Sequence, residues 1–172
     1  GSQGARIMSD IVPPAISALP QHLRRNIRVS HQARPEDLDR VRDYYESELI
    51  TADVQTFFDD VPRRMADAQL VISRSGASTV ADVSIIGRPA LWVPLASAIR
   101  DEQTANARQL VEADAAQIMT EAEFEVAPLT EKLTALLSDE AGMMKMAQAA
   151  VKCGVPDATD RLVALVEELA QK

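Results

Sequence analysis

Short apolar runs alternate with helical patterns along most of this 172-residue chain, and this alternation restricts the fold more than any other feature. Strands are expected at residues 26–30, 53–58, 68–73, 90–93 and 115–119. Helical patterns lie between them, and only helical patterns follow the last one. Strands that alternate with helices predict a parallel, doubly wound α/β sheet of the Rossmann type.

The start of the chain bears on the centre of that sheet. In a doubly wound fold the first strand is central and leads into a glycine-rich turn. Here a segment of small residues, Gly-Ser-Gln-Gly-Ala-Arg at 1–6, comes first and runs directly into a helical pattern. We therefore expect a sheet that lacks its first strand, and a native polypeptide longer than this chain.

Composition excludes several classes of protein. The chain has 18 basic and 26 acidic residues and no Lys/Arg cluster, which argues against nucleic-acid binding. It has one cysteine, no apolar run of about 20 residues and no ligand spacing typical of a metal site. No metal or cofactor is predicted. With a net charge of −8, an anionic ligand has to be held by local geometry such as a helix N-terminus.

One segment has that geometry. Residues 72–82 run from a buried strand through a turn of small residues into a helix that begins near Ser78 and Thr79. Backbone N–H groups and the helix dipole at such a start attract a diphosphate, and Asp82, further along, suits ribose hydroxyls. Equally, Ser78 could be an ordinary helix cap and Asp82 an acid placed favourably in the first turn.

Further candidates follow other strands. Gln103 and Asn106 lie near the start of a helix after the fourth strand, where doubly wound sheets bind ligands, and could hydrogen-bond a sugar. Phe58 ends the second strand and suits either a base ring or the core. His31, at the end of the first expected strand, is a possible base but is more often structural.

In order along the chain, these motifs resemble a known family. They are Gly-Ser-Gln-Gly-Ala-Arg, Phe-Phe-Asp-Asp, Arg-Ser-Gly-Ala-Ser-Thr-Val-Ala-Asp, Gly-Arg-Pro-Ala-Leu-Trp-Val-Pro, Asp-Glu-Gln-Thr-Ala-Asn-Ala and, at 155–161, Val-Pro-Asp-Ala-Thr-Asp-Arg. The chain is similar to the C-terminal half of the MurG family, the UDP-N-acetylglucosamine:lipid I N-acetylglucosaminyltransferases.

The resemblance implies a fold and a site. The fold is the C-terminal half of a GT-B glycosyltransferase, with a donor-binding Rossmann-like domain at 1–155 and a helix at 156–172 that packs toward an N-terminal domain. Ser2 is expected to reach the donor, the Phe58 backbone to contact the uracil, and Gln103 to contact the GlcNAc. The diphosphate and ribose are expected to bind Ala77, Ser78, Thr79, Val80, Ala81 and Asp82. The family usually has Glu at the position of Asp82.

The implied reaction moves GlcNAc from UDP-GlcNAc to lipid I with inversion, giving lipid II for the peptidoglycan cell wall. The catalytic base, the lipid acceptor site and the contacts with the cytoplasmic face of the inner membrane are expected in the N-terminal domain. This chain alone is therefore expected to be inactive, and the whole protein to be a peripheral membrane enzyme.

The residues alone are also compatible with other functions. The same pocket would suit another GT-B transferase or a UDP-GlcNAc epimerase-like enzyme. A non-catalytic nucleotide-sugar-binding module would use the same helix start without chemistry.

Overall fold

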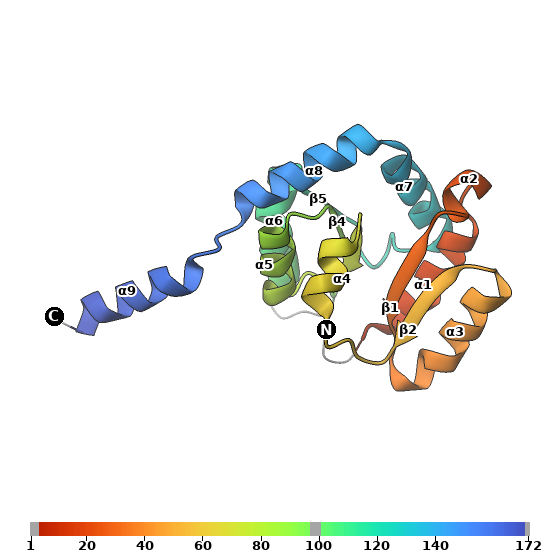
Figure 1. The fold of residues 1–172 in the computed structure, drawn as a ribbon, viewed down its shortest axis with the longest axis horizontal. Helices are drawn as coiled ribbons and strands as arrows, with labels where there is room; N and C mark the ends of the chain where they lie inside the picture. Colours follow the sequence, from red (N-terminus) through yellow and green to blue (C-terminus); the bar gives the residue numbers. More distant parts are fainter. Residues whose placement is uncertain (1–3, 97–100, 171–172) are drawn as a thin grey trace.

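The computed structural model describes residues 4–96 and 101–170, and its elements alternate between helices and short strands (Figure 1). In chain order they are α1 (Arg6–Ser17), α2 (Gln21–Arg24), β1 (Arg28–Gln32), η1 (Pro35–Asp37), α3 (Leu38–Ser47), β2 (Thr51–Gln55), α4 (Val61–Asp67), β3 (Val71–Ser73), α5 (Ala77–Ile86), β4 (Ala90–Trp92), α6 (Glu102–Glu112), β5 (Ala116–Ile118), α7 (Val126–Ser138), α8 (Glu140–Cys153) and α9 (Ala158–Ala170).

All five expected strands are present and all their pairings are parallel, which confirms the α/β class. They form two sheets, however, and not one. The first has the order β1-β2 and the second β3-β4-β5. The doubly wound order predicts one continuous sheet, whereas in the described residues no strand pairing joins these two sheets.

The β4 strand is the centre of the larger sheet, and its alternating side chains enter two different cores. Leu91 points into a cluster with α1 and α7, whereas Trp92 points into a cluster with α5, α6 and α8. Both side chains are fully buried. Helices therefore cover both faces of this sheet, as the uninterrupted apolar pattern of the strand predicts.

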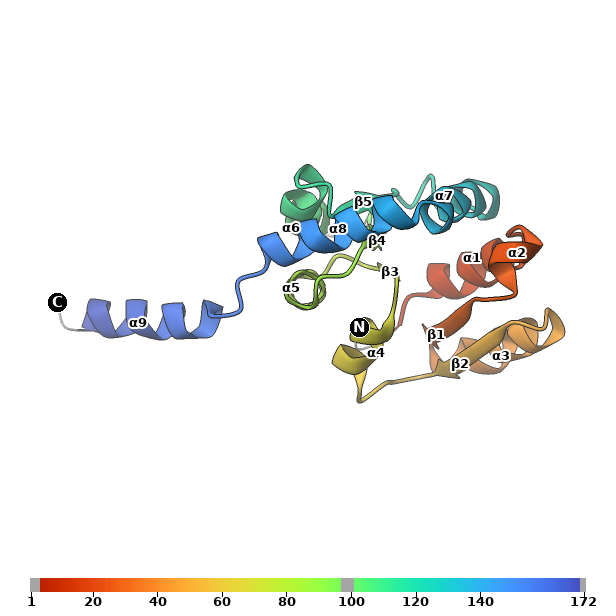
Figure 2. The same cartoon turned by 45° about the horizontal axis from the view of Figure 1, so that its top comes forward.

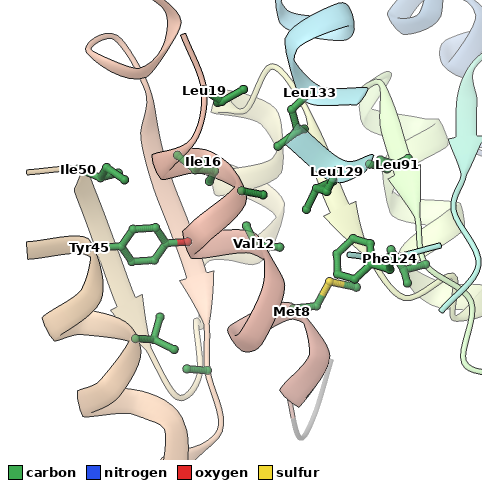
Figure 3. Packing of buried hydrophobic residues seen from close by; sticks show 14 of the residues in the cluster. Met8, Val12, Ile16, Leu19, Tyr45, Ile50, Leu91, Phe124, Leu129 and Leu133 are labelled. Atoms are coloured by element: carbon green, nitrogen blue, oxygen red, sulfur yellow. The ribbon is translucent and has the colours of Figure 1, made fainter. Parts of the chain in front are cut away.

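Although the two sheets share no strand pairing, one core joins them. Helix α1 lies between β1-β2 with α3 on one side and α7 on the other (Figure 2). Figure 3 shows Val12 and Ile16 of α1 between Tyr45 of α3 and Leu129 of α7. Hydrophobic burial across this helix holds the two sheets together where backbone hydrogen bonds do not.

Helix α9 differs from the rest because it extends away from the body of the molecule (Figures 1 and 2). Every residue described in it is exposed. The helix is nevertheless amphipathic, with polar residues beside its large apolar ones. The exposed large apolar side chains are those of Leu162, Val163, Leu165, Val166 and Leu169. An amphipathic helix is expected to bury such a face against a partner.

Candidate donor-binding site

The candidate site lies at the carboxyl ends of β3 and β4, the edge at which parallel sheets bind ligands. Strand β3 ends at Ser73, and the turn Arg74-Ser75-Gly76 leads directly into α5. Gly76 is the N-cap, with φ −63° and ψ 146°. The space beside its Cα is empty, because an added Cβ would meet no heavy atom within 4 Å. A ligand can therefore approach the backbone at the start of the helix.

Three backbone donors are left at this start. The N–H of Val80 bonds to the carbonyl of Gly76, so intrahelical bonding begins with Val80. The preceding N–H groups, of Ala77, Ser78 and Thr79, have no partner within the helix, as at the start of any α-helix. Ala77 and Ser78 are also exposed, and α5 has no acidic residue in its first turn. These amides and the helix dipole suit a doubly charged phosphate group.

The structure decides against the alternative roles of two residues here. Ser78 is not a helix cap, because Gly76 has that position and no side chain caps the helix. Asp82 is the sixth residue of α5, exposed, and lies beyond the first turn. Of the neighbouring residues, Val80 is buried in the core and Ala81 is exposed.

Gln103 lies close to this helix start, on α6. The Ser75 hydroxyl, fully buried, donates to the Gln103 carbonyl at 2.8 Å. The Gln103 side chain accepts a hydrogen bond from the N–H of Leu95 through Oε1 at 3.0 Å. Asn106, the other residue that could hydrogen-bond a sugar, donates from Nδ2 to the Ser75 carbonyl at 3.1 Å. The starts of α5 and α6 are therefore fixed to each other.

Two charged residues near the site were not predicted from the sequence. Arg74 forms an ion pair with Glu121, and its guanidinium also donates to the carbonyls of Val93 and Pro94 at 3.0 and 3.1 Å. Both charged side chains are about a quarter exposed. The position of Arg74 directly before the small-residue turn is visible in the sequence, but its distant partner is not.

Phe58 belongs to a different part of the molecule, after the end of β2. Its side chain is buried, and the Arg64 guanidinium lies over the ring, 4.0 Å from its centroid. Arg64 is itself held by Asp53 at 2.7 Å and Asp60 at 2.6 Å. The Phe58 ring is thus part of the packing and does not stack on a base. The Ser2 prediction lies outside the described residues.

His31 is a structural residue in this fold. Its Nε2 lies 3.2 Å from the Ser9 hydroxyl and its Nδ1 lies 3.1 Å from the Tyr45 hydroxyl, and all three side chains are buried. Burial, with a smaller contribution from Arg40, lowers the pKa of His31 to about 4. Burial likewise raises the pKa of Tyr45. The imidazole is neutral near pH 7 and joins α1, β1 and α3.

Two cavities lie away from the candidate site. The larger, about 380 Å³, is bounded by β5, α7 and α8, and the smaller, about 110 Å³, by α1 and α3. Across 4–96 and 101–170, no group of three or more His, Cys, Asp or Glu residues is arranged to hold a metal ion. In the same ranges no helix is both long and apolar enough to cross a membrane.

An open helix start beside a second loop at the carboxyl edge of a parallel sheet is typical of nucleotide-binding α/β domains. Comparison with known proteins is more specific. Residues 1–162 match the family described as Glycosyltransferase family 28 C-terminal domain, and the chain belongs to this family.

Curated relatives are similar over nearly the whole chain. The UDP-N-acetylglucosamine--N-acetylmuramyl-(pentapeptide) pyrophosphoryl-undecaprenol N-acetylglucosamine transferase of Phenylobacterium zucineum is 42% identical over 99% of this chain and 47% of its own length. The enzyme of the same description from Methylobacterium sp. is 47% identical over 99% of this chain and 46% of its own length. The chain spans about half the length of these relatives.

Solved structures give the same fold. The crystal structure of Acinetobacter baumannii MurG aligns with a TM-score of 0.89 at 30% identity, covering 98% of this chain and 48% of that one. Spinosyn forosaminyltransferase SpnP aligns with a TM-score of 0.55 at 15% identity, which supports the fold alone. The chain corresponds to a C-terminal half, as the resemblance implies.

Proposed function

We propose that this chain is the donor-binding part of an inverting transferase that moves GlcNAc from UDP-GlcNAc to lipid I. The observation that carries the proposal is the start of α5, where three amides without helical partners open at the carboxyl edge of the sheet in a family 28 domain. The sugar, the nucleotide and the lipid-linked acceptor are taken from the curated relatives, which are described as UDP-N-acetylglucosamine--N-acetylmuramyl-(pentapeptide) pyrophosphoryl-undecaprenol N-acetylglucosamine transferases.

The diphosphate of the donor is assigned to the first turn of α5. Amides of Ala77, Ser78 and Thr79 would donate to the phosphate oxygens. The positive end of the helix dipole stabilises the negative charge that develops on UDP as the sugar leaves, without need of a metal. Val80 and Ala81, the next two residues of α5, are assigned to the same segment around the diphosphate and ribose. Preorganised donors of this kind lower the barrier because they need no reorientation during the reaction.

The remaining donor contacts surround the diphosphate. The exposed carboxylate of Asp82 is assigned to the ribose hydroxyls and the backbone at Phe58 to the uracil. Gln103 is assigned to the GlcNAc, and Ser2 to the donor from the glycine-rich segment. Asp82 is one methylene shorter than the usual Glu of the family, so the ribose has to lie closer to α5.

The acceptor side of the reaction is assigned to the other half of the full-length protein. The catalytic base, the lipid I site and the peripheral contact with the cytoplasmic face of the inner membrane would all lie there. We accordingly expect no transfer by the isolated chain. Detectable conversion of lipid I by residues 1–172 alone would contradict the assignment of the catalytic base and the lipid I site to the other half.

The division into 1–155 and 156–172 fits the exposed position of α9. This helix has an apolar face and no buried residue in its described part, so we propose that it packs against the N-terminal half. Association of the separate halves, measured with and without residues 156–172, tests the assignment. Equal affinity in both cases would contradict it.

A backbone substitution tests the diphosphate site most directly. Ala77 is the first residue of α5, a position that accepts proline, and Gly76 has the extended ψ that a following proline requires. Ala77→Pro therefore deletes one N–H donor and leaves the helix intact. Since a hydrogen bond to a charged group contributes about 1.5–3 kcal/mol, UDP affinity should fall roughly 10- to 150-fold.

The control is Ala77→Ser, which adds a polar side chain but retains the N–H group and should bind UDP nearly normally. Both variants are measured by calorimetry in the complete polypeptide that contains this sequence. Ser78→Ala/Asp82→Ala is the second test, and unchanged UDP affinity in it and in Ala77→Pro would reject the site. Preference for UDP-GlcNAc over UDP-glucose and TDP-sugars separates this function from that of a GT-B transferase with another donor.

A further inference from the structure

Side chains from three other segments hold four backbone groups of the turn after β4, which comprises residues 93–96. Arg74, after β3, binds the carbonyls of Val93 and Pro94. Glu121, after β5, accepts from the N–H of Ala96 through Oε2 at 3.3 Å. Gln103, on α6, accepts from the N–H of Leu95. The Arg74–Glu121 ion pair thus crosses the end of β4 and fixes the turn between its two neighbouring strands.

This arrangement fixes the orientation of the Gln103 carboxamide. A backbone N–H can only donate, so the atom of Gln103 that faces Leu95 has to be the oxygen. With Oε1 committed at 3.0 Å, the amide nitrogen is left to contact a ligand. Gln103 therefore offers hydrogen-bond donors, and it selects a ligand that presents an acceptor oxygen such as a hydroxyl or the carbonyl of an acetamido group.

We infer that Arg74 and Glu121 are positioning residues, which hold the turn at 93–96 so that the Gln103 amide nitrogen faces the sugar of the donor. The inference rests on the proposed function, because it is the nucleotide sugar that gives the Gln103 amide its partner. The inference divides the donor site into two parts. The nucleotide is assigned to the N–H groups at the start of α5, none of which hydrogen-bonds the described turn at 93–96. The sugar is assigned to Gln103, which is bonded to that turn directly.

Glu121→Gln is the most informative substitution. It retains the size of the side chain but replaces one carboxylate oxygen by an NH2 group. That group has to face either Arg74 or the N–H of Ala96, which are both donors. We expect the turn to loosen, the Kd for UDP-GlcNAc to rise about 5- to 20-fold, and the Kd for UDP to stay within about twofold. The selective loss is a result that general destabilisation does not produce.

Glu48→Gln is the matched control. Glu48 is also a partly exposed glutamate that pairs with an arginine, Arg24 at 3.8 Å, and accepts from a hydroxyl, that of Ser17. It precedes β2 and so lies at the amino edge of its sheet, opposite the candidate site. Its replacement should leave the ratio of the two Kd values unchanged.

Arg74→Lys provides a second variant, since one ammonium group cannot replace a guanidinium that binds two carbonyls and a carboxylate. Hydrogen exchange of the Leu95 and Ala96 amides gives a readout without ligand, and it should accelerate in both variants. All measurements use the complete polypeptide that contains this sequence.

The outcomes are distinct. Selective weakening of UDP-GlcNAc binding in Glu121→Gln and Arg74→Lys, absent from Glu48→Gln, supports the inference. Equal weakening of UDP and UDP-GlcNAc, or unchanged binding of both, overturns it and leaves the proposed function intact. Failure of the unsubstituted protein to bind UDP overturns the proposed function, and this inference with it.

Discussion

Helix α5 is bounded by two glycines with different backbone requirements, and alanine substitution at each should separate stability from binding. Gly87 ends the helix with φ +76°, and its N–H bonds to the Val83 carbonyl at 2.9 Å. A Cβ at Gly87 would lie 2.2 Å from Cγ2 of Val151 on α8. Gly76 begins the helix with a φ of −63°, which any residue can adopt, and has open space beside it.

The cost of Gly87→Ala has two sources. The left-handed conformation costs an L-residue about 1–2 kcal/mol. The contact with Val151 adds about 1–3 kcal/mol, because valine in a helix has one strongly preferred rotamer and cannot easily turn away. The total is about 2–5 kcal/mol. For a chain of this size that corresponds to a fall in Tm of roughly 4–20 °C.

Gly76→Ala should lower the affinity for UDP and have little effect on stability. Its backbone conformation suits alanine, and a less flexible unfolded chain contributes up to about 1 kcal/mol of stability. Since an N-cap position prefers glycine over alanine by a similar amount, the free energy of unfolding should change by less than about 1 kcal/mol. UDP affinity should fall, because the added methyl group occupies the open space where the diphosphate is assigned. The matched substitution at the other end of the same helix serves as the control for each measurement.

Thermal unfolding followed by circular dichroism measures both variants, and calorimetry measures UDP binding. A double-mutant cycle with Val151→Ala isolates the contact, since the smaller residue removes Cγ2 and should recover the steric part of the loss. The reasoning is refuted if Gly87→Ala leaves Tm unchanged, or if Gly76→Ala destabilises the chain as much as Gly87→Ala does.

Three further predictions concern the rest of the chain. Because burial lowers the pKa of His31 to about 4, the unfolded state with its ordinary value near 6.5 binds the proton more tightly. Stability should therefore fall by up to about 3 kcal/mol between pH 6.5 and 4, and urea unfolding of His31→Gln should lack this contribution. Leu129→Ala, at a fully buried site between α7 and α1, should cost about 2–5 kcal/mol in the same assay, whereas Leu169→Ala on α9 should change little. Deletion of residues 158–172 should leave the Tm of this chain unchanged, because α9 buries no described residue; a lower Tm would show contacts that the structure lacks.

Local signals in the sequence determined the elements of this protein. A glycine after an apolar helical pattern is a local signal for the end of a helix, and α5 ends at Gly87 because its left-handed backbone favours glycine. All five strands were predicted, although β1 and β2 are displaced by about two residues from the expected ranges, because strand ends are set by pairing with a neighbour. The small-residue turn before α5 likewise predicted where a phosphate-binding helix start would lie.

Only the tertiary structure decided which side chains meet. The pairing of Arg74 with Glu121 and the bond from Ser75 to Gln103 join residues far apart in the sequence, and no spacing or composition predicts them. The same holds for His31, whose burial between Ser9 and Tyr45 makes it structural. Residue type and local pattern fix backbone conformation and the chemistry available. Packing of distant segments fixes orientation, burial and charge pairing, and these properties convert an open helix start into a candidate site for a particular sugar nucleotide.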